Sequence, residues 1–490
     1  MTVEQILTGL HEFINFMNGY LWGPPMLIML FGTHLFLTYR LRFIQRYTPE
    51  AVKLSLNKKT EGAGDVSQFG ALMTALAATI GTGNIVGVAT AVTLGGPGAV
   101  LWMWLTGVFG IATKYSEALL SVKYRVKTED GTMLGGPMYA IEKGLGMKWL
   151  AVLFCVFTAI AAFGIGNMVQ ANSISTLLNE TFKISPYISG LVMTVITAFV
   201  ILGGITSIAR VCGFLVPFMA FFYVAGCAFI LALNFNLIVP AIILICKSAF
   251  TAQAAGGGFI GASVLMAARF GVARGLFSNE SGLGSAPIVA AAAQTKNPVR
   301  QALVSSTGTF WDTVVVCAMT GLVIVTSIIK DPAGLAYLKG ASLTKAAFAE
   351  IPVIGPAILT VGLLTFVFST ILGWSYYGER AVEYLFGKRS IAPYRWMWVG
   401  AVMAGSVISL PMVWDFADMM NALMAIPNLI VLLALNGVIV AETKKYLWDG
   451  NLDAEETPAR SAKDAAYEIA EAEFEKLTTM NKTDPETDSE

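Results

Sequence analysis

The stretch Ala77-Ala78-Thr79-Ile80-Gly81-Thr82-Gly83-Asn84-Ile85-Val86-Gly87 places three glycines and an amide side chain inside a long apolar segment. A second apolar segment is interrupted in the same way by Gly275-Leu276-Phe277-Ser278-Asn279-Glu280-Ser281-Gly282-Leu283-Gly284-Ser285. Close packing of helices explains glycine pairs, but it does not explain Asn84 or the polar run Ser278–Ser281 at membrane depth. Because unwound backbone survives in a membrane only where it is buried in protein or lines a cavity, both stretches predict a binding site.

The composition predicts an integral membrane protein. Of the 490 residues, 56% are hydrophobic and only 13% are charged, whereas about a quarter of the residues are charged in soluble domains. Soluble enzymes and nucleic-acid-binding proteins are thereby excluded. His11, His34 and the five cysteines show no metal-ligand spacing and no CxxC pattern, so the sequence gives no basis for a resident metal, a disulfide framework or an organic cofactor.

Apolar runs long enough to cross the bilayer as helices predict an all-α polytopic protein with eleven transmembrane spans. The segment Leu237–Phe250 is apolar but short, and we expect an interfacial or re-entrant helix there. The expected spans are 15–38, 68–94, 98–122, 149–178, 187–209, 211–233, 270–294, 300–328, 353–380, 395–411 and 416–440.

Charge sets the expected orientation. Lys and Arg concentrate in the loops 39–66 and 123–148, and such loops are retained in the cytoplasm. We therefore expect the N-terminus outside and the C-terminus in the cytoplasm of a cell membrane, or of the inner membrane where there are two. Residues 449–490 carry 13 Asp or Glu against 4 Lys or Arg, which predicts a solvated acidic tail, with a weakly amphipathic helix over 459–479.

The two interrupted spans begin two consecutive blocks of five spans. Five is odd, so the blocks enter the membrane from opposite sides, as in the inverted repeats of secondary transporters. A channel would need a continuous polar pore, and an intramembrane enzyme would need a nucleophile with its base; the sequence offers neither. The expected organisation is an N-terminal helix and basic loop at 1–67, a first repeat at 68–233, a loop with a short interfacial helix at 234–269, a second repeat at 270–440 and an acidic tail at 441–490.

Four motifs in this order make residues 20–440 resemble the alanine or glycine:cation symporter family: Ile80–Ala89, Gly135-Gly136-Pro137-Met138-Tyr139, Arg274–Pro287 and Ser369–Glu379. The resemblance implies a leucine-transporter-type fold with a 5+5 inverted repeat and one extra N-terminal helix. It also implies sodium-coupled symport of small neutral amino acids, with no enzymatic activity.

For the ion, the resemblance implies a sodium site between the spans 68–94 and 353–380. Sodium seeks oxygen ligands, and the family fold would supply carbonyls and hydroxyls from Ala77, Ile80, Phe366, Ser369 and Thr370. A second sodium site near Thr79 and Asn84 has weaker support. Back-bonding of the Ser369 and Thr370 hydroxyls to their own helix is the structural alternative.

A zwitterionic substrate needs donors for its carboxylate and acceptors for its ammonium group. The backbone amides of Thr82, Gly83 and Asn84, at a half-helix end, are the predicted donors. The predicted acceptors are the carbonyls of Gly275, Leu276 and Phe277, the Ser278 hydroxyl and the Asn279 amide. Gln170 is expected to reach either end of the substrate, and the predicted pocket wall consists of Phe163, Phe277 and Trp374, although packing explains each of these residues as well.

Lys114 and Glu117 stand three residues apart and are expected to pair with each other, while Glu280 and Asp312 are candidates for proton relays or gates. Several alternatives stay open at this point: proton coupling in place of sodium, and glutamine or serine in place of alanine or glycine. The D or L preference, the stoichiometry and the oligomeric state stay open as well.

Overall fold

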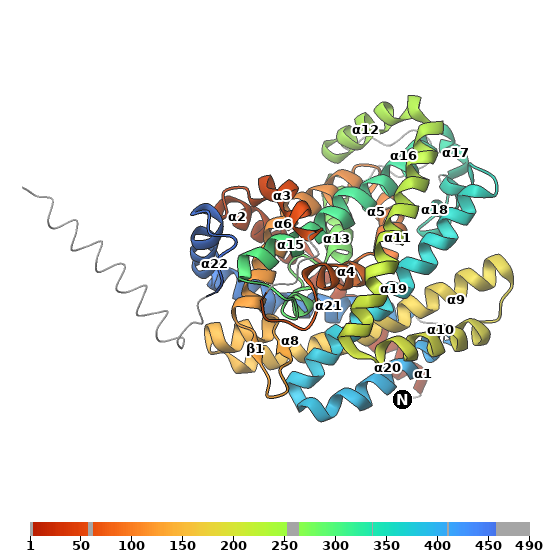
Figure 1. Cartoon of the computed structure of the whole chain (residues 1–490). Coiled ribbons are helices and arrows are strands. Elements are labelled where there is room, and N and C mark those ends of the chain that lie inside the picture. Colours follow the sequence, from red (N-terminus) through yellow and green to blue (C-terminus); the bar gives the residue numbers. More distant parts are fainter. Residues whose placement is uncertain (1–2, 57–61, 252–263, 336, 409–410, 457–490) are drawn as a thin grey trace, which may run out of the picture.

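The computed structural model describes residues 3–56, 62–251, 264–335, 337–408 and 411–456, and this part of the chain is almost entirely helical (Figure 1). The first helices are α1 (Val3–Leu21), α2 (Pro24–Arg40), α3 (Thr48–Ser55), α4 (Gln68–Thr79), α5 (Val88–Gly95), α6 (Ala99–Lys123), α7 (Pro137–Tyr139), α8 (Lys148–Ala161), α9 (Val169–Phe182), α10 (Pro186–Ile201) and α11 (Gly204–Leu233). The others are α12 (Phe235–Phe250), α13 (Val264–Asn279), α14 (Pro287–Ala290), α15 (Pro298–Thr309), α16 (Ala318–Lys330), α17 (Pro332–Leu335), α18 (Ala341–Ala349), α19 (Ile354–Phe386), α20 (Ile391–Val407), α21 (Pro411–Ala434) and α22 (Asn436–Thr443).

Shorter elements join these helices. Two strands, β1 (Val126–Lys127) and β2 (Met133–Leu134), form an antiparallel hairpin with Val126 opposite Leu134. Short 3-10 turns lie at η1 (Ile44–Tyr47) and η6 (Lys388–Ser390), and wider π-helical turns lie at η2 (Gly83–Gly87), η3 (Ala140–Gly144), η4 (Ala162–Met168), η5 (Phe310–Cys317) and η7 (Lys444–Trp448). Such π-helical turns often accompany functional sites, and here η2, η4 and η5 lie in predicted spans.

Among the described residues, five helical stretches are long and apolar enough to cross a membrane, and the number is seven if each of two bent pairs counts as one span. The five are 148–182, 204–233, 298–330, 354–386 and 413–434; the bent pairs are α1 with α2, at 42°, and α4 with η2 and α5, at 52°. The predicted spans 98–122, 187–209, 270–294 and 395–411 correspond to α6, α10, α13 and α20, and they stay predictions as spans.

Three predicted spans need correction. The span 15–38 is two helices, because Pro24 and Pro25 end one helix path and begin the next. The span 187–209 ends at Ile201, where Gly204 (φ +71°) begins a new helix. The span 270–294 loses its helical backbone after Asn279. A helix, α12, is present over the segment 237–250, where an interfacial or re-entrant helix is expected; its place relative to the membrane stays a prediction.

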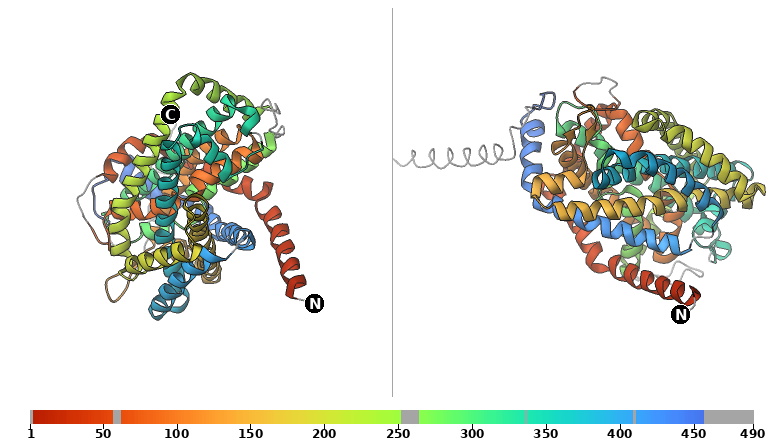
Figure 2. Two further views of the ribbon diagram at one scale, coloured as in Figure 1. Left: turned by 90° about the vertical axis from the view of Figure 1, so that its right-hand side faces the viewer. Right: turned by 90° about the horizontal axis from the view of Figure 1, so that it is seen from below.

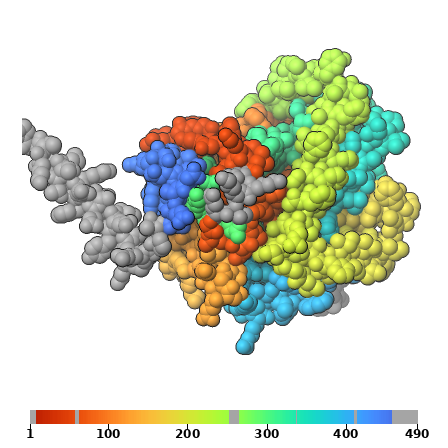
Figure 3. Space-filling model, in the orientation of Figure 1, coloured from red at the N-terminus to blue at the C-terminus, as the bar shows by residue number. Residues whose placement is uncertain are grey.

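The helices form two packed groups. In one group α6 packs against α2, α13 and α15; in the other α8 packs against α19 and α21, and α10 against α20. α11 packs on both α4 and α19. Its outer side is apolar, with Phe214, Phe218 and Phe221 exposed, and Figure 3 shows α11 running along the surface of the molecule. α1 extends away from the body towards the N-terminus (Figure 2). A lipid-facing surface is the natural environment for the exposed phenylalanines of α11.

The residues that follow Trp448 stay largely exposed, but hydrogen bonds and ion pairs hold several of them to the body of the protein. We call residues 449–456 the C-terminal strap. Asn297 donates its side-chain amide to the carbonyls of Leu452 and Ala454, at 2.8 and 2.9 Å, and Arg300 forms an ion pair with Asp453. The acidic side chains find cationic partners at the ends of α6 and α15, so part of the tail is ordered. The helix expected over 459–479 lies outside the described residues.

Glycine allows α13 to approach α6 closely. A Cβ at Gly271 would stand 2.4 Å from the Ala99 carbonyl oxygen and 2.7 Å from Trp102 Cβ. We expect Gly271→Ala to destabilise the protein by about 1–3 kcal/mol or more through overpacking. The measurement is the apparent melting temperature in detergent. Gly400→Ala on α20 is the control, since nothing lies within 4 Å of its added Cβ; equal melting temperatures for the two variants would contradict the prediction.

Candidate functional site

The end of α4 is unwound in a way that releases two backbone carbonyls. The amide of Gly81 donates to Asn84 Oδ1 at 2.9 Å, and not to the Ala77 carbonyl that a continuing helix would use. The amide of Asn84 donates to the Gly81 carbonyl at 3.3 Å, which leaves the Ile80 carbonyl outside the helical pattern. The broken helix therefore presents the oxygens of Ala77 and Ile80 at a buried position.

Two hydroxyls of α19 meet these carbonyls. Ser369 Oγ lies 3.2 Å from Ala77 O and 2.8 Å from Phe366 O. Thr370 Oγ1 lies 3.4 Å from Ile80 O and 3.0 Å from Phe366 O. The five oxygens predicted to bind sodium are thus brought together from two helices, and all five residues are buried.

The chemistry of this oxygen cluster fits a small monovalent cation. Its five atoms are neutral oxygens, which a hard cation such as Na⁺ accepts. The approach depends on glycine, because a Cβ at Gly81 would stand 2.5 Å from Thr370 Oγ1. Back-bonding to the Phe366 carbonyl is present as well, so the hydroxyls of Ser369 and Thr370 are shared between their own helix and α4.

Thr79, the residue expected at a second ion position, does not join this cluster. Its hydroxyl donates weakly to the Leu76 carbonyl of its own helix, at 3.4 Å. Its role as an ion ligand stays a prediction without geometric support.

The second break begins after α13. Glu280, Gly282 and Gly284 have φ values of +56°, +94° and +84°, which turn the chain away from the helix path. Gly275 and Leu276 lie before this point, in continuous helix, and the Leu276 carbonyl accepts the Glu280 amide at 2.9 Å. The expectation that these two residues offer free carbonyls to a ligand therefore finds no geometric support.

Phe277 and Ser278 are the residues whose carbonyls the break does release. The Ser281 amide donates to Asn279 Oδ1 at 2.9 Å, although a continuing helix would direct it to Phe277 O. The end of α13 faces the first break: a Cβ at Gly83 would stand 3.2 Å from Phe277 Cδ1 and 3.3 Å from Ser278 Cα. The two interrupted segments therefore meet, as the sequence predicted.

Asp312, in the π-helical turn η5, links the two breaks. Its Oδ1 accepts from Asn84 Nδ2 at 2.7 Å, and its Oδ2 accepts from Ser278 Oγ at 2.9 Å and from Thr313 Oγ1 at 2.6 Å. Asn279 donates to Thr313 Oγ1 at 3.1 Å. The Ser278 hydroxyl and the Asn279 amide, predicted as acceptors for an ammonium group, are thus already bonded within the protein. Thr313 was missed, because a single threonine in an apolar span gives no signal.

Gln170 reaches the first break from α9. Its Nε2 donates to Ile165 O at 2.8 Å and lies 3.4 Å from Thr82 Oγ1. Its Oε1 is buried and has no hydrogen-bond partner among the described residues. A buried amide oxygen without a partner is costly, so a ligand or a water molecule beside Thr82 would satisfy it.

The predicted aromatic wall is divided. Trp374 is buried and packs on the backbone at Gly166, whose added Cβ would stand 2.3 Å from Trp374 Cβ. Phe277 lies at Gly83. Phe163 belongs to another cluster, with ring centroids 5.3 Å from Tyr394 and 5.4 Å from Trp398 of α20, so its side chain packs between helices.

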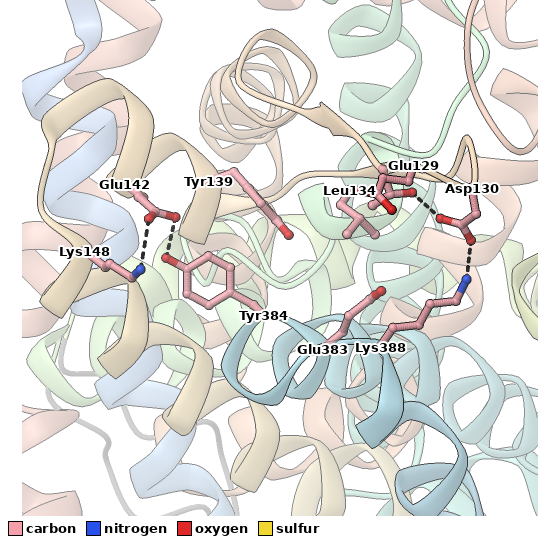
Figure 4. Close-up of a pocket in the computed structure, with 11 residues that line it drawn as sticks. Glu129, Asp130, Leu134, Tyr139, Glu142, Lys148, Glu383, Tyr384 and Lys388 are labelled. Carbon is pink, nitrogen blue, oxygen red and sulfur yellow. Dashed lines mark hydrogen bonds and ion pairs between the residues drawn. The ribbon is translucent and has the colours of Figure 1, made fainter.

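A separate polar cavity of about 530 Å³ lies beside the β1–β2 hairpin. Figure 4 shows Lys388 reaching Asp130 at 2.5 Å, while Lys148 and Tyr384 are both directed at Glu142. The hydrogen bond from Lys388 holds the pKa of Asp130 below its usual range. None of the predicted site residues is among those that line this cavity.

Comparison with known proteins shows which family the chain belongs to. The model of the sodium:alanine symporter family matches residues 7–460. The "Sodium/alanine symporter AgcS" of Methanococcus maripaludis is 54% identical over 440 residues, which cover 88% of this chain and 96% of that protein. The "Probable sodium/glutamine symporter GlnT" of Bacillus subtilis is 34% identical over 448 residues, which cover 91% of each protein.

A solved structure shares the fold. The protein in "Crystal structure of MhsT in complex with L-phenylalanine" aligns with a TM-score of 0.53 at 15% identity, over 81% of this chain and 94% of that one. The solved structures that match this chain are helical membrane transporters of the leucine-transporter-type fold. With a matching family model and a relative more than half identical, this chain is a multi-pass membrane transporter and not an enzyme, and it belongs to the sodium:alanine symporter family.

Proposed function

We propose that the protein couples the inward movement of Na⁺ to the uptake of a small neutral amino acid, alanine or glycine, by alternating access. The observation that carries this proposal is the cluster of five neutral oxygens from Ala77, Ile80, Phe366, Ser369 and Thr370. The helix break releases two of its carbonyls, and Gly81 allows Thr370 to approach them. The similarity to a sodium/alanine symporter supports the same choice of ion and substrate.

The substrate is proposed to bind where the two breaks meet. Its carboxylate would accept from the amides of Thr82 and Gly83, since the Asn84 amide already donates to the Gly81 carbonyl. The released carbonyls of Phe277 and Ser278 would accept from its ammonium group. Gln170 Oε1, which is buried without a partner among the described residues, is a further acceptor on a side chain that reaches the first break. Trp374 is proposed to wall the side-chain end of the site, which would suit a small side chain.

The proposed architecture has eleven spans, with five-span repeats at 68–233 and 270–440, an N-terminal unit at 1–67, a connecting loop at 234–269 and a tail at 441–490. The N-terminus would lie outside and the C-terminus in the cytoplasm of the cell or inner membrane, which places the β1–β2 hairpin on the cytoplasmic side.

One sodium ion is energetically sufficient. An ion that enters across about 100 mV releases roughly 2.3 kcal/mol, and a tenfold inward gradient adds about 1.4 kcal/mol. The sum of about 3.7 kcal/mol supports several-hundredfold accumulation of a neutral solute.

Uptake of radiolabelled alanine into proteoliposomes tests the proposal. We expect an imposed Na⁺ gradient to drive uptake and an imposed H⁺ gradient to leave it near background. Equal uptake with the two gradients would favour proton coupling, for which the buried Asp312 carboxyl is the candidate. Competition by unlabelled glycine, serine and glutamine ranks the substrates; preference for glutamine would agree with the similarity to the probable sodium/glutamine symporter.

A further inference from the structure

The unwound segment 280–286 creates an energetic problem that the protein must solve. The segment is buried, with Glu280, Ser281, Leu283 and Ser285 at most 3% exposed. A buried N–H or C=O without a partner costs several kcal/mol in a membrane interior. The atoms that replace the lost helical partners of this segment therefore determine its shape.

Lys114 of α6 binds the acceptor side of the break. Its Nζ donates to the carbonyl of Asn279, the last residue of α13, at 2.8 Å. An ammonium group at a helix C-terminus is stabilised by the helix dipole. The last carbonyl of the helix is therefore already hydrogen-bonded to Lys114.

Glu117, one turn along α6, binds the donor side. Its Oε1 accepts from the amides of Gly282 and Gly284, at 3.0 and 3.1 Å, and from Asn428 Nδ2 of α21 at 2.7 Å. The positive φ values of the two glycines turn both amides towards one point, which makes a small anion-binding nest. Asn428 also donates to the Gly282 carbonyl at 2.9 Å. The expected Lys114–Glu117 ion pair is not found among the ion pairs of the described residues; both side chains bind the broken segment instead.

We propose that Lys114 and Glu117 are positioning residues that determine which carbonyls of α13 are free to bind substrate. If the helix continued, the Gly282 amide would donate to the Ser278 carbonyl. Glu117 takes that amide, so Ser278 O stays available, and Lys114 covers the next carbonyl, Asn279 O. The pair therefore keeps the Ser278 carbonyl unbonded near Gly83, while the bond from the Ser281 amide to Asn279 Oδ1 does the same for the Phe277 carbonyl.

The charges of the pair support this role. Lys114 interacts electrostatically with Glu117, Glu280 and Asp312, which lie around the two breaks. The part of this inference that concerns substrate binding rests on the proposed function. The part that concerns the backbone of residues 280–286 does not.

Hydrogen–deuterium exchange tests the backbone part without any substrate. In the full-length protein in detergent, we expect peptides that cover 277–286 to be protected in wild type and to exchange at least tenfold faster in Lys114→Met and in Glu117→Ala. Peptides from α4 should keep their protection. Ser116→Ala is the matched control on the same helix, since its hydroxyl bonds only to the Ala112 carbonyl. Unchanged exchange over 277–286 in both variants would overturn the proposal.

Ligand binding tests the positioning part. We expect Lys114→Met and Glu117→Ala to raise the Kd for alanine at least tenfold, or the Kd for glutamine if glutamine is the ligand of the wild type. The melting-temperature shift that Na⁺ causes without substrate should persist, because the proposed ion cluster lies between α4 and α19. Glu117→Gln keeps an acceptor oxygen and should stay within about threefold of wild type.

The outcomes separate the two proposals. A wild type without any Na⁺-induced shift would refute the proposed ion coupling, whereas the exchange result would still decide the role of Lys114 and Glu117. Parallel loss of the Na⁺ shift and of substrate binding would show a purely structural role and overturn the inference. If Glu117→Ala does not fold, the same exchange and binding measurements are made on the milder variant Lys114→Gln.

Discussion

The double variant Ser369→Ala/Thr370→Ala is expected to lose sodium-dependent uptake, with the half-saturating Na⁺ concentration raised about 100-fold or more. The two hydroxyls are two of the five clustered oxygens, at 2.8–3.4 Å from the three carbonyls. Each lost contact to a charged partner costs about 1.5–3 kcal/mol, so the two together cost about 3 kcal/mol or more, which corresponds to a factor of at least about 100. Initial uptake rates as a function of Na⁺ concentration measure the effect.

Thr365→Ala is the matched control for this variant. Thr365 lies on the same helix, and its hydroxyl bonds only to carbonyls of that helix, Val361 and Gly362. We expect its Na⁺ dependence to equal that of wild type. If the double variant also kept a normal Na⁺ dependence, the cluster between α4 and α19 would not be the ion site.

Gly81→Ala is expected to reduce uptake by more than 90% while the protein still folds. The added Cβ would stand 2.5 Å from Thr370 Oγ1, so either the hydroxyl turns away or α4 and α19 separate. Gly81 is not among the glycines with positive φ, so steric contact at the oxygen cluster, and not backbone strain, causes the loss. Uptake at saturating Na⁺ and the melting temperature, measured together, separate a damaged site from an unfolded protein.

Gly87→Ala in the same broken span is the control. Only the Thr82 carbonyl oxygen lies within 4 Å of its added Cβ, at 3.9 Å, and its φ of −61° suits any residue. We expect near-normal transport from this variant. Equal activity of the Gly81 and Gly87 variants would contradict the close approach at Thr370 as a requirement for transport.

Local sequence was sufficient to predict the first break. Gly81, Gly83 and Asn84 lie within four residues, and the Asn84 side chain itself replaces the helical partner of the Gly81 amide. The grouping of the five oxygens needed the family resemblance in addition, because Ala77 and Ser369 are 292 residues apart in the chain.

The second break could be located only approximately. Its polar residues indicated an interruption between Gly275 and Ser285, but the helix continues to Asn279 because its end is fixed from outside. The side chains that fix it, Lys114 and Glu117, are 165 residues away from the backbone atoms that they bind. Spacing along one helix suggested only that these two would pair with each other.

For Phe163, the sequence alone could not decide between a pocket wall and a helix interface. An aromatic residue in a span rich in small residues fits a pocket wall and a helix interface equally well. The outcome depended on Tyr394 and Trp398, which only the tertiary fold brings to it.

The C-terminal strap has a practical consequence for anyone who attaches a reporter to this protein. Its last described residue, Glu456, is hydrogen-bonded through its backbone to Lys296 at 2.7 Å and ion-paired with Lys123. A fluorescent protein fused directly after α22 would remove these contacts and expose Asn297 and Arg300 at the start of α15. A fusion placed after residue 456 keeps the strap. Comparing the brightness and melting temperature of the two fusions would show how much the strap contributes to a well-folded product.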